Sequence, residues 1–116
     1  MLVFAAGIYL IFNYFFTEIE INKYETMKEV RKHQAIERGW VPDILPKSAY
    51  DIAETHDLDT NKVYGRFYYK EEDEAAFMQQ LQPVHDSNDT YKWQDFLFKP
   101  DTKSNSVRYR NKPSAQ

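Results

Sequence analysis

Cysteine is absent from this chain of 116 residues, which excludes disulfide bridges, thiolate metal sites, a cysteine nucleophile and lipidation through cysteine. Glycine is scarce, and the three glycines form no loop of the kind that cradles phosphate. Neither a G-x-S-x-G nor an H-E-x-x-H motif is present. We therefore expect no cofactor, no metal ion and no enzymatic activity.

The chain also has no block of basic residues. Its formal net charge is −3, and Lys and Arg are interspersed with carboxylates along the sequence. Because a nucleic-acid interface needs basic residues gathered on one face, we expect no nucleic-acid partner. Aromatic residues make up 16% of the chain, and such a composition is typical of one small folded domain.

The first sixteen residues, MLVFAAGIYLIFNYFF, contain no charged side chain. A helix of this length spans roughly 24 Å, so a continuation to residue 21 would bring it close to a bilayer core. Small residues do not follow the apolar run, which argues against a cleaved signal sequence, and a core helix would lack a polar face. We interpret residues 1–21 as a single-pass anchor in a lipid bilayer, with Leu2, Phe4, Ile8, Leu10, Ile11 and Phe15 facing lipid.

The flanking charges leave the orientation of this anchor open. Four basic residues follow the segment and favour a cytoplasmic domain: Lys23, Lys28, Arg31 and Lys32. However, Glu18 and Glu20 precede them.

The rest of the chain predicts a small α+β domain over residues 22–110 and a disordered tail over 111–116. Asn22 and Glu25 have the spacing of a helix cap, and Gly39 is a plausible terminator, so we expect a helix over 23–38. We expect a β-hairpin with strands 52–56 and 62–69, a helix over 71–81, and strands at 93–98 and 106–110. The fold class is then an N-terminal transmembrane helix followed by a small antiparallel sheet with one or two packed helices.

The stretch from His33 to Phe67 contains the segment G-W-x-P-x-x-L-P-x-S-A, followed by a D-L-D-T-N turn and an aromatic strand. This pattern resembles a group of small, uncharacterised bacterial envelope proteins. The resemblance implies no activity. It implies a membrane-anchored protein of the inner (cytoplasmic) membrane whose domain faces the periplasm.

Two features are weak candidates for chemistry. Asp57, Asp59 and Asn61 alternate as the first ligands of a calcium loop do, but Lys62 and Tyr68 stand where that loop needs Gly and Glu. Turn formation by these side chains explains the pattern better. His33, His56 and His85 lie far apart in the sequence. A pair such as His56 with Asp57 or Asp59 could act as an acid–base couple, but adjacent residues on a strand point to opposite faces.

Aromatic residues in the expected strands exceed what a thin core needs. Tyr and Trp on an exposed sheet face are favoured contact residues. We therefore expect a non-catalytic accessory protein of the bacterial envelope that binds a protein partner through an aromatic face made by Tyr64, Tyr68, Trp93, Phe96 and Phe98. Two alternatives are an immunity or inhibitor protein against an envelope-acting toxin and, less favoured, a small hydrolase-type enzyme.

Overall fold

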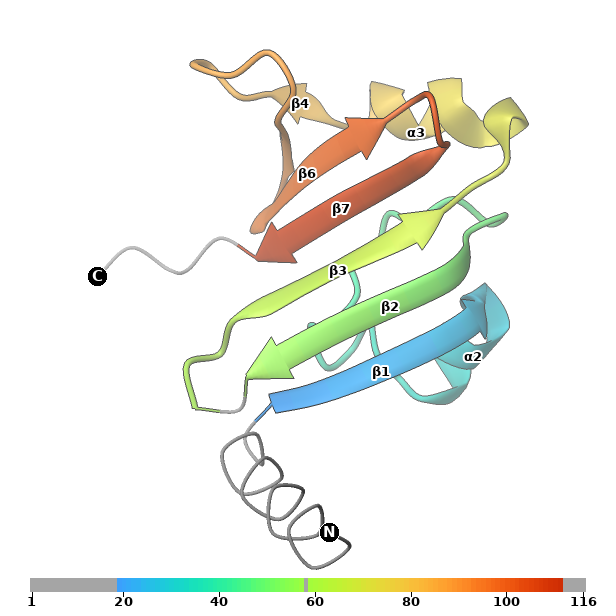
Figure 1. Cartoon of the computed structure of the whole chain (residues 1–116), viewed down its shortest axis with the longest axis vertical. Helices are drawn as coiled ribbons and strands as arrows, with labels where there is room; N and C mark the ends of the chain where they lie inside the picture. Colours follow the sequence, from blue (N-terminus) through green and yellow to red (C-terminus); the bar gives the residue numbers. More distant parts are fainter. Residues whose placement is uncertain (1–18, 58, 112–116) are drawn as a thin grey trace, which may run out of the picture.

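The computed structural model describes residues 19–57 and 59–111 and contains a seven-stranded antiparallel sheet (Figure 1). The strands lie in the order β1-β2-β3-β7-β6-β5-β4. Their bounds are β1 Ile19–Thr26, β2 Tyr50–Asp57, β3 Val63–Tyr68, β4 Gln82–Pro83, β5 Tyr91–Trp93, β6 Phe96–Asp101 and β7 Ser106–Asn111. The predicted antiparallel sheet is confirmed, although the domain contains more strands than predicted from the sequence.

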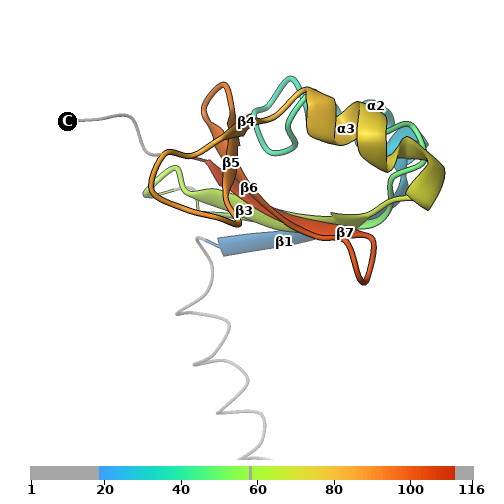
Figure 2. The ribbon, with the colours of Figure 1, turned by 90° about the horizontal axis from the view of Figure 1, so that it is seen from above.

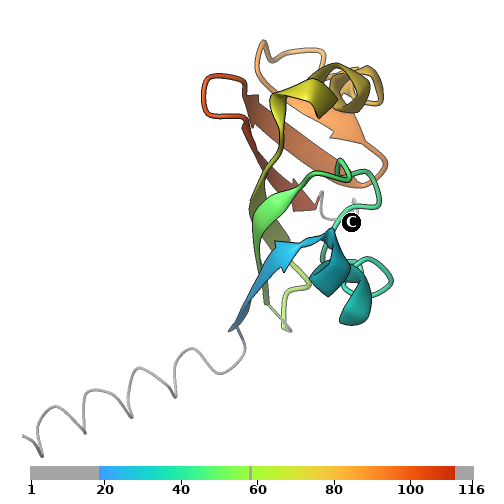
Figure 3. The same cartoon turned by 90° about the vertical axis from the view of Figure 1, so that its right-hand side faces the viewer.

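All described helices lie on one face of this sheet. These are α2 (Met27–Lys32), the short 3-10 helix η1 (Glu71–Asp73) and α3 (Glu74–Gln79). Figures 2 and 3 show α2, α3 and the loop between α2 and β2 together on this side, while no described element covers the opposite side. The fold therefore has one covered face and one open face.

The predicted helix over residues 23–38 is confirmed only over Met27–Lys32, and residues 33–38 form turns. Residues up to Thr26 belong to β1, which pairs with β2 from Ile19 opposite Asp57 to Thr26 opposite Tyr50. The helix begins four residues later, where Thr26 and Glu29 repeat the capping spacing: the Thr26 backbone N–H and hydroxyl both bond the Glu29 carboxylate. Pairing along a whole strand outweighed the local cap signal at Asn22.

The predicted hairpin is confirmed as β2 and β3, and the predicted strand over 106–110 is confirmed as β7. The single strand predicted over 93–98 is two strands instead. Gln94 has φ +50°, and a tight turn at Gln94 and Asp95 separates β5 from β6, with Trp93 opposite Phe96. Pro100 lies inside β6 and does not end it. The pairing of β6 with β5 stops at Phe98, so Pro100 lies where β6 has no described neighbour on that side.

The core lies between the sheet and the helices and is largely aromatic. Phe77 of α3 packs edge-on against both Phe67 of β3 and Phe98 of β6, with ring centroids 5.6 and 5.9 Å apart. Edge-to-face contacts at these distances are the favoured geometry for aromatic pairs. Alternate residues of each strand point into this core, so the intervening residues of the same strands form the open face.

Candidate interaction surface

The predicted membrane anchor lies almost wholly outside the described residues. Strand β1 begins at Ile19, so residues 19–21 of the predicted 1–21 anchor belong to the sheet. Within residues 19–57 and 59–111, no helix is long and apolar enough to cross a membrane.

The open face is formed by the outward side chains of the five longest strands. We define it by Ile21, Lys23, Glu25, Tyr50, Ala53, Thr55, Tyr64, Arg66, Tyr68, Leu97, Lys99, Asp101, Ser106, Arg108 and Arg110. Ile21 is 69% exposed and Tyr64 is 53% exposed, which is unusual for large apolar and aromatic side chains. This face therefore leaves a broad mixed surface in solvent, with aromatic, aliphatic and basic groups and the two carboxylates of Glu25 and Asp101.

Strand register aligns the basic residues of the open face into one row across the sheet. Lys23 lies opposite Ala53, Ala53 opposite Arg66, Arg66 opposite Arg108, and Arg108 opposite Lys99. We call Lys23, Arg66, Arg108 and Lys99 the cation row. With strands about 4.8 Å apart, the row extends roughly 19 Å across five strands.

The tyrosines flank the cation row. Tyr50 and Tyr68 lie opposite each other and stack, with ring centroids 5.8 Å apart. The Arg66 guanidinium lies 5.3 Å from the centre of the Tyr68 ring, within the range of a cation–π contact. A hollow of about 620 Å³ is lined by these three residues together with Lys23, Glu25, Asp51 and Ala53. Tyr64 borders a second hollow of about 270 Å³, which Arg108 and Arg110 also line.

The five residues predicted to make one contact face are divided between the two faces of the sheet. Tyr64 and Tyr68 lie on the open face. Phe98 is a fully buried core residue, and Phe96 packs against Phe98 and Tyr109. Trp93 pairs with Phe96 and packs against the core from β5. Because the hairpin turn after Trp93 was missed, these three residues could not be assigned to a face from the sequence.

The Asp57–Asn61 loop uses its side chains for turn formation, as predicted. One carboxylate oxygen of Asp57 accepts hydrogen bonds from the backbone N–H groups of Asp59 (2.9 Å) and Thr60 (3.3 Å). These bonds, led by that from Asp59, hold the pKa of Asp57 below its usual range. Asn61 adopts φ +62°, a conformation that asparagine tolerates well. No group of three or more His, Asp or Glu side chains in the described part of the chain is arranged to hold a metal ion.

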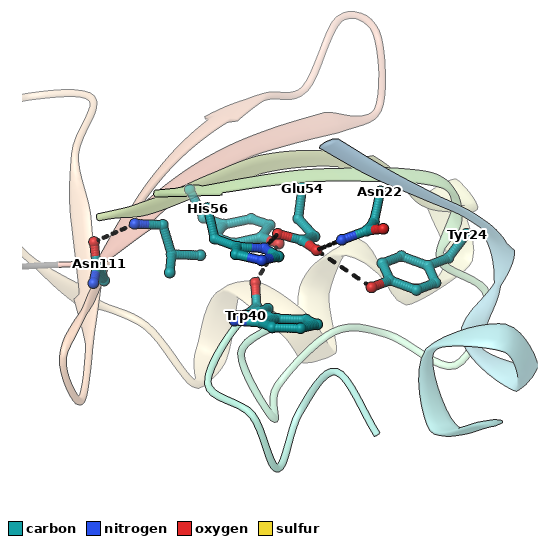
Figure 4. Close-up of polar contacts among 8 residues, drawn as sticks. Asn22, Tyr24, Trp40, Glu54, His56 and Asn111 are labelled. Atoms are coloured by element: carbon teal, nitrogen blue, oxygen red, sulfur yellow. Dashed lines mark hydrogen bonds and ion pairs between the residues drawn. The ribbon is translucent and has the colours of Figure 1, made fainter. Parts of the chain in front are cut away.

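His56 contacts Glu54, a residue that was not among those predicted from the sequence. Both side chains point into the covered face, 2% and 1% exposed, and His56 Nδ1 lies 3.0 Å from Glu54 Oε2 (Figure 4). The Asn22 amide donates to Glu54 Oε1 at 2.7 Å, and the Tyr24 hydroxyl donates to the same oxygen at 3.3 Å. Residues two apart on a strand share a face, so this spacing was the signal that could have identified Glu54.

Trp40 closes this polar cluster from the loop side. Its indole stacks on the His56 imidazole, with centroids 3.9 Å apart and planes 9° from parallel (Figure 4). The Tyr109 hydroxyl donates to the Trp40 backbone carbonyl at 2.9 Å. A pocket of about 210 Å³ is lined by Trp40 and His56 together with Arg38, Asn61 and Asn111. A carboxyl–imidazole pair can orient a general base, but here it joins β1, β2 and the α2–β2 loop inside the protein.

A second surface feature lies on the covered side. It is a groove of about 430 Å³ between α2, the loop over residues 43–47 and α3, and Met27, Ile44 and Leu45 contribute to its lining. Arg31 and Gln80 also line this groove. The groove is the natural alternative to the open face as a contact site, so tests of the open face need controls placed here.

These features define a small antiparallel-sheet domain with one helix-covered face and one open face. Residues 18–68 match the family model of the YbbD head domain. The chain is thus similar to that family over β1, α2, β2 and β3, which carry Lys23, Arg66 and the Glu54–His56 pair. The match is just under half of the chain and ends before β6 and β7. No curated protein and no solved structure matches the chain.

Proposed function

We propose that this protein is a non-catalytic binding module of the bacterial envelope that contacts a protein partner through the open face of its sheet. In this proposal the apolar N-terminal segment anchors the chain in the inner membrane with the domain in the periplasm. The uncharged run of sixteen residues and the resemblance to envelope proteins support that location. Tethering raises the effective concentration of a small domain near a membrane assembly.

The observation that carries this proposal is the exposure of Tyr64, Tyr50 and Ile21 on a sheet face that no other described element covers. Large side chains of this kind bury much area for little conformational entropy when a partner covers them. The neighbouring hollow of about 620 Å³ has an aromatic wall and charged edges, a combination frequent at protein interfaces.

The experiment is crosslinking in cells followed by affinity purification of the full tagged chain from detergent-solubilised membranes. We expect the Tyr64→Ala/Tyr68→Ala variant to lose proteins that crosslink to the wild type. The control is Glu72→Ala/Gln80→Ala, which alters two exposed positions on the helix side. Equal recovery of the same proteins by the wild type and the tyrosine variant would contradict the proposal.

The same purification separates the two alternative functions. An immunity or inhibitor protein would yield a one-to-one complex with the product of a neighbouring gene, and deletion of the gene alone would be toxic. A hydrolase would lose activity when His56 is replaced, whereas its partners would be unaffected by replacement of Tyr64 and Tyr68.

A further inference from the structure

The cation row contradicts a local rule of sheet stability. Arg66 lies directly opposite Arg108, and Arg108 lies directly opposite Lys99, so three like charges are neighbours on adjacent strands. Like charges at directly opposed positions destabilise a sheet. Departures of this kind from local consistency are expected where function requires them.

Two carboxylates of the open face, Glu25 and Asp101, lie near the two ends of the cation row, each two residues from a lysine of the row on the same strand. In the described part of the chain, no carboxylate forms an ion pair with Lys23, Arg66 or Arg108. Lys99 lies 3.8 Å from Asp89, and both side chains are largely exposed, so that pair is weak. The row itself contains no acidic residue, although the whole chain has a net charge of −3.

We propose that the open face recognises an acidic protein segment, whose carboxylates pair with the cation row while its apolar side chains pack on the flanking residues. This inference rests on the proposed function and specifies its partner. A row of roughly 19 Å matches an acidic helix of about thirteen residues or an extended segment of about six. Arginine pairs with carboxylates through two parallel hydrogen bonds, which gives such a contact direction as well as charge.

The residues on both sides of the row favour a protein segment over a polyphosphate or a lipid surface. Ile21 and Leu97 share one neighbouring row with Tyr64, and Tyr50 and Tyr68 flank the other side. Aliphatic and aromatic groups around charged anchors are typical of protein interfaces. The net negative charge of the chain also repels a long polyanion more strongly than a short acidic segment.

The test is selection of sixteen-residue peptides from a random phage library on the full chain in nanodiscs of neutral lipid. We expect the selected peptides to be enriched in Asp and Glu and to retain Leu, Phe or Tyr. Their affinity should fall at least tenfold in Arg108→Glu and several-fold between 50 and 200 mM NaCl. The matched control is Lys47→Glu/Lys70→Glu, which reverses two exposed charges outside the open face and should bind as the wild type does.

The Arg108→Glu variant also separates recognition from folding. It places a carboxylate opposite Arg66 and Lys99, where the wild type has a like charge. Its melting temperature should therefore equal or exceed that of the wild type, while peptide binding is lost. If this variant fails to fold, Arg108→Gln provides the same comparison.

Three results would overturn the inference. The first is the selection of peptides that are not enriched in acidic residues and whose binding depends on Tyr64 and Tyr68 but not on Arg108. This result would leave the proposed function intact. The second is the absence of selected peptides together with tight binding of a twenty-nucleotide oligo(dT) or of phosphatidylglycerol vesicles. The third is binding that the control variant loses as readily as Arg108→Glu does.

Discussion

At the scale of single residues, Glu54 of β2 binds the neighbouring strand β1 through its side chain. Its carboxyl group accepts hydrogen bonds from Asn22 and Tyr24 and contacts His56, and it is 1% exposed. We expect Glu54→Ala to lower the free energy of unfolding by about 3 kcal/mol, because it removes the buried hydrogen bonds that Asn22 and Tyr24 donate to the carboxylate and its contact with His56. Glu54→Gln retains one acceptor oxygen and should lower the free energy of unfolding by a smaller amount.

Urea denaturation followed by tryptophan fluorescence measures this difference, since Trp40 stacks on His56 in the same cluster. Glu37→Ala, at an exposed position, is the control and should change the free energy of unfolding by less than about 0.5 kcal/mol. A Glu54→Ala variant as stable as this control would show that the cluster does not stabilise the fold.

Two glycines illustrate different constraints. A Cβ atom on Gly65 would lie 2.5 Å from the Ala53 carbonyl oxygen and 2.6 Å from the Tyr109 ring, so Gly65→Ala should cost about 2 kcal/mol or more. At Gly39 a Cβ atom meets nothing within 4 Å, but φ is +80°, so Gly39→Ala should cost about 1 kcal/mol. Thermal melting of both variants tests this order, and the reverse order would refute the packing of Tyr109 on Gly65.

At the scale of elements, the connection from β3 to α3 contains a buried phenol. The Tyr69 hydroxyl donates to the Glu74 carboxylate at 2.6 Å, and burial, aided by this carboxylate, raises the pKa of Tyr69 well above 10. Because the folded state holds this proton more tightly, its stabilising contribution is complete below about pH 10. The contribution is lost as the pH rises from 10 toward the folded pKa.

We therefore expect the wild type to lose more stability between pH 8 and pH 11 than Tyr69→Phe does. Urea midpoints at the two pH values provide the measurement. Burial also raises the pKa of Tyr109, so Tyr69→Phe/Tyr109→Phe should be the least sensitive variant. If all three proteins lost equal stability between pH 8 and pH 11, the raised pKa values of Tyr69 and Tyr109 would be contradicted.

The central strands carry a stability cost that one substitution should relieve. Arg108→Glu converts the contacts with Arg66 and Lys99 into opposite-charge pairs. Cross-strand pairs of this kind contribute roughly 0.2–1 kcal/mol each, so we expect a gain of about 0.5–1 kcal/mol in the free energy of unfolding at low salt. Measurement at 50 mM and 500 mM NaCl checks the electrostatic origin, because salt should remove most of the gain. A loss of stability at low salt would mean that the row is not strained.

Local patterns predicted those elements whose hydrophobic period was clear. Alternation over residues 62–69 and 106–110 was sufficient for β3 and β7, and the acidic turn before Phe77 was sufficient for α3. The sequence could not show that Lys23 belongs to a strand, because Asn22 and Glu25 imitate a helix cap. It also could not show the cation row, because Lys23, Arg66, Lys99 and Arg108 meet only through the register of strands distant in the chain.

At the scale of the whole molecule, the two faces of the sheet have different roles. The covered face contains the aromatic core and the Glu54–His56 cluster, which account for the stability of the domain. The open face exposes tyrosines and aligned cations that contribute little to that stability. An interaction role for the open face explains why these groups lie together on one side.

The most direct measurement is site-specific photo-crosslinking of the full chain in living cells. A photoreactive phenylalanine analogue replaces Tyr64 or Thr55 on the open face, and Gln80 or Arg31 in the helix-side groove. The account predicts that the two open-face positions crosslink to a protein partner and that the two groove positions do not. Crosslinks formed from Gln80 and Arg31 but not from Tyr64 and Thr55 would place the partner on the covered side and contradict the account.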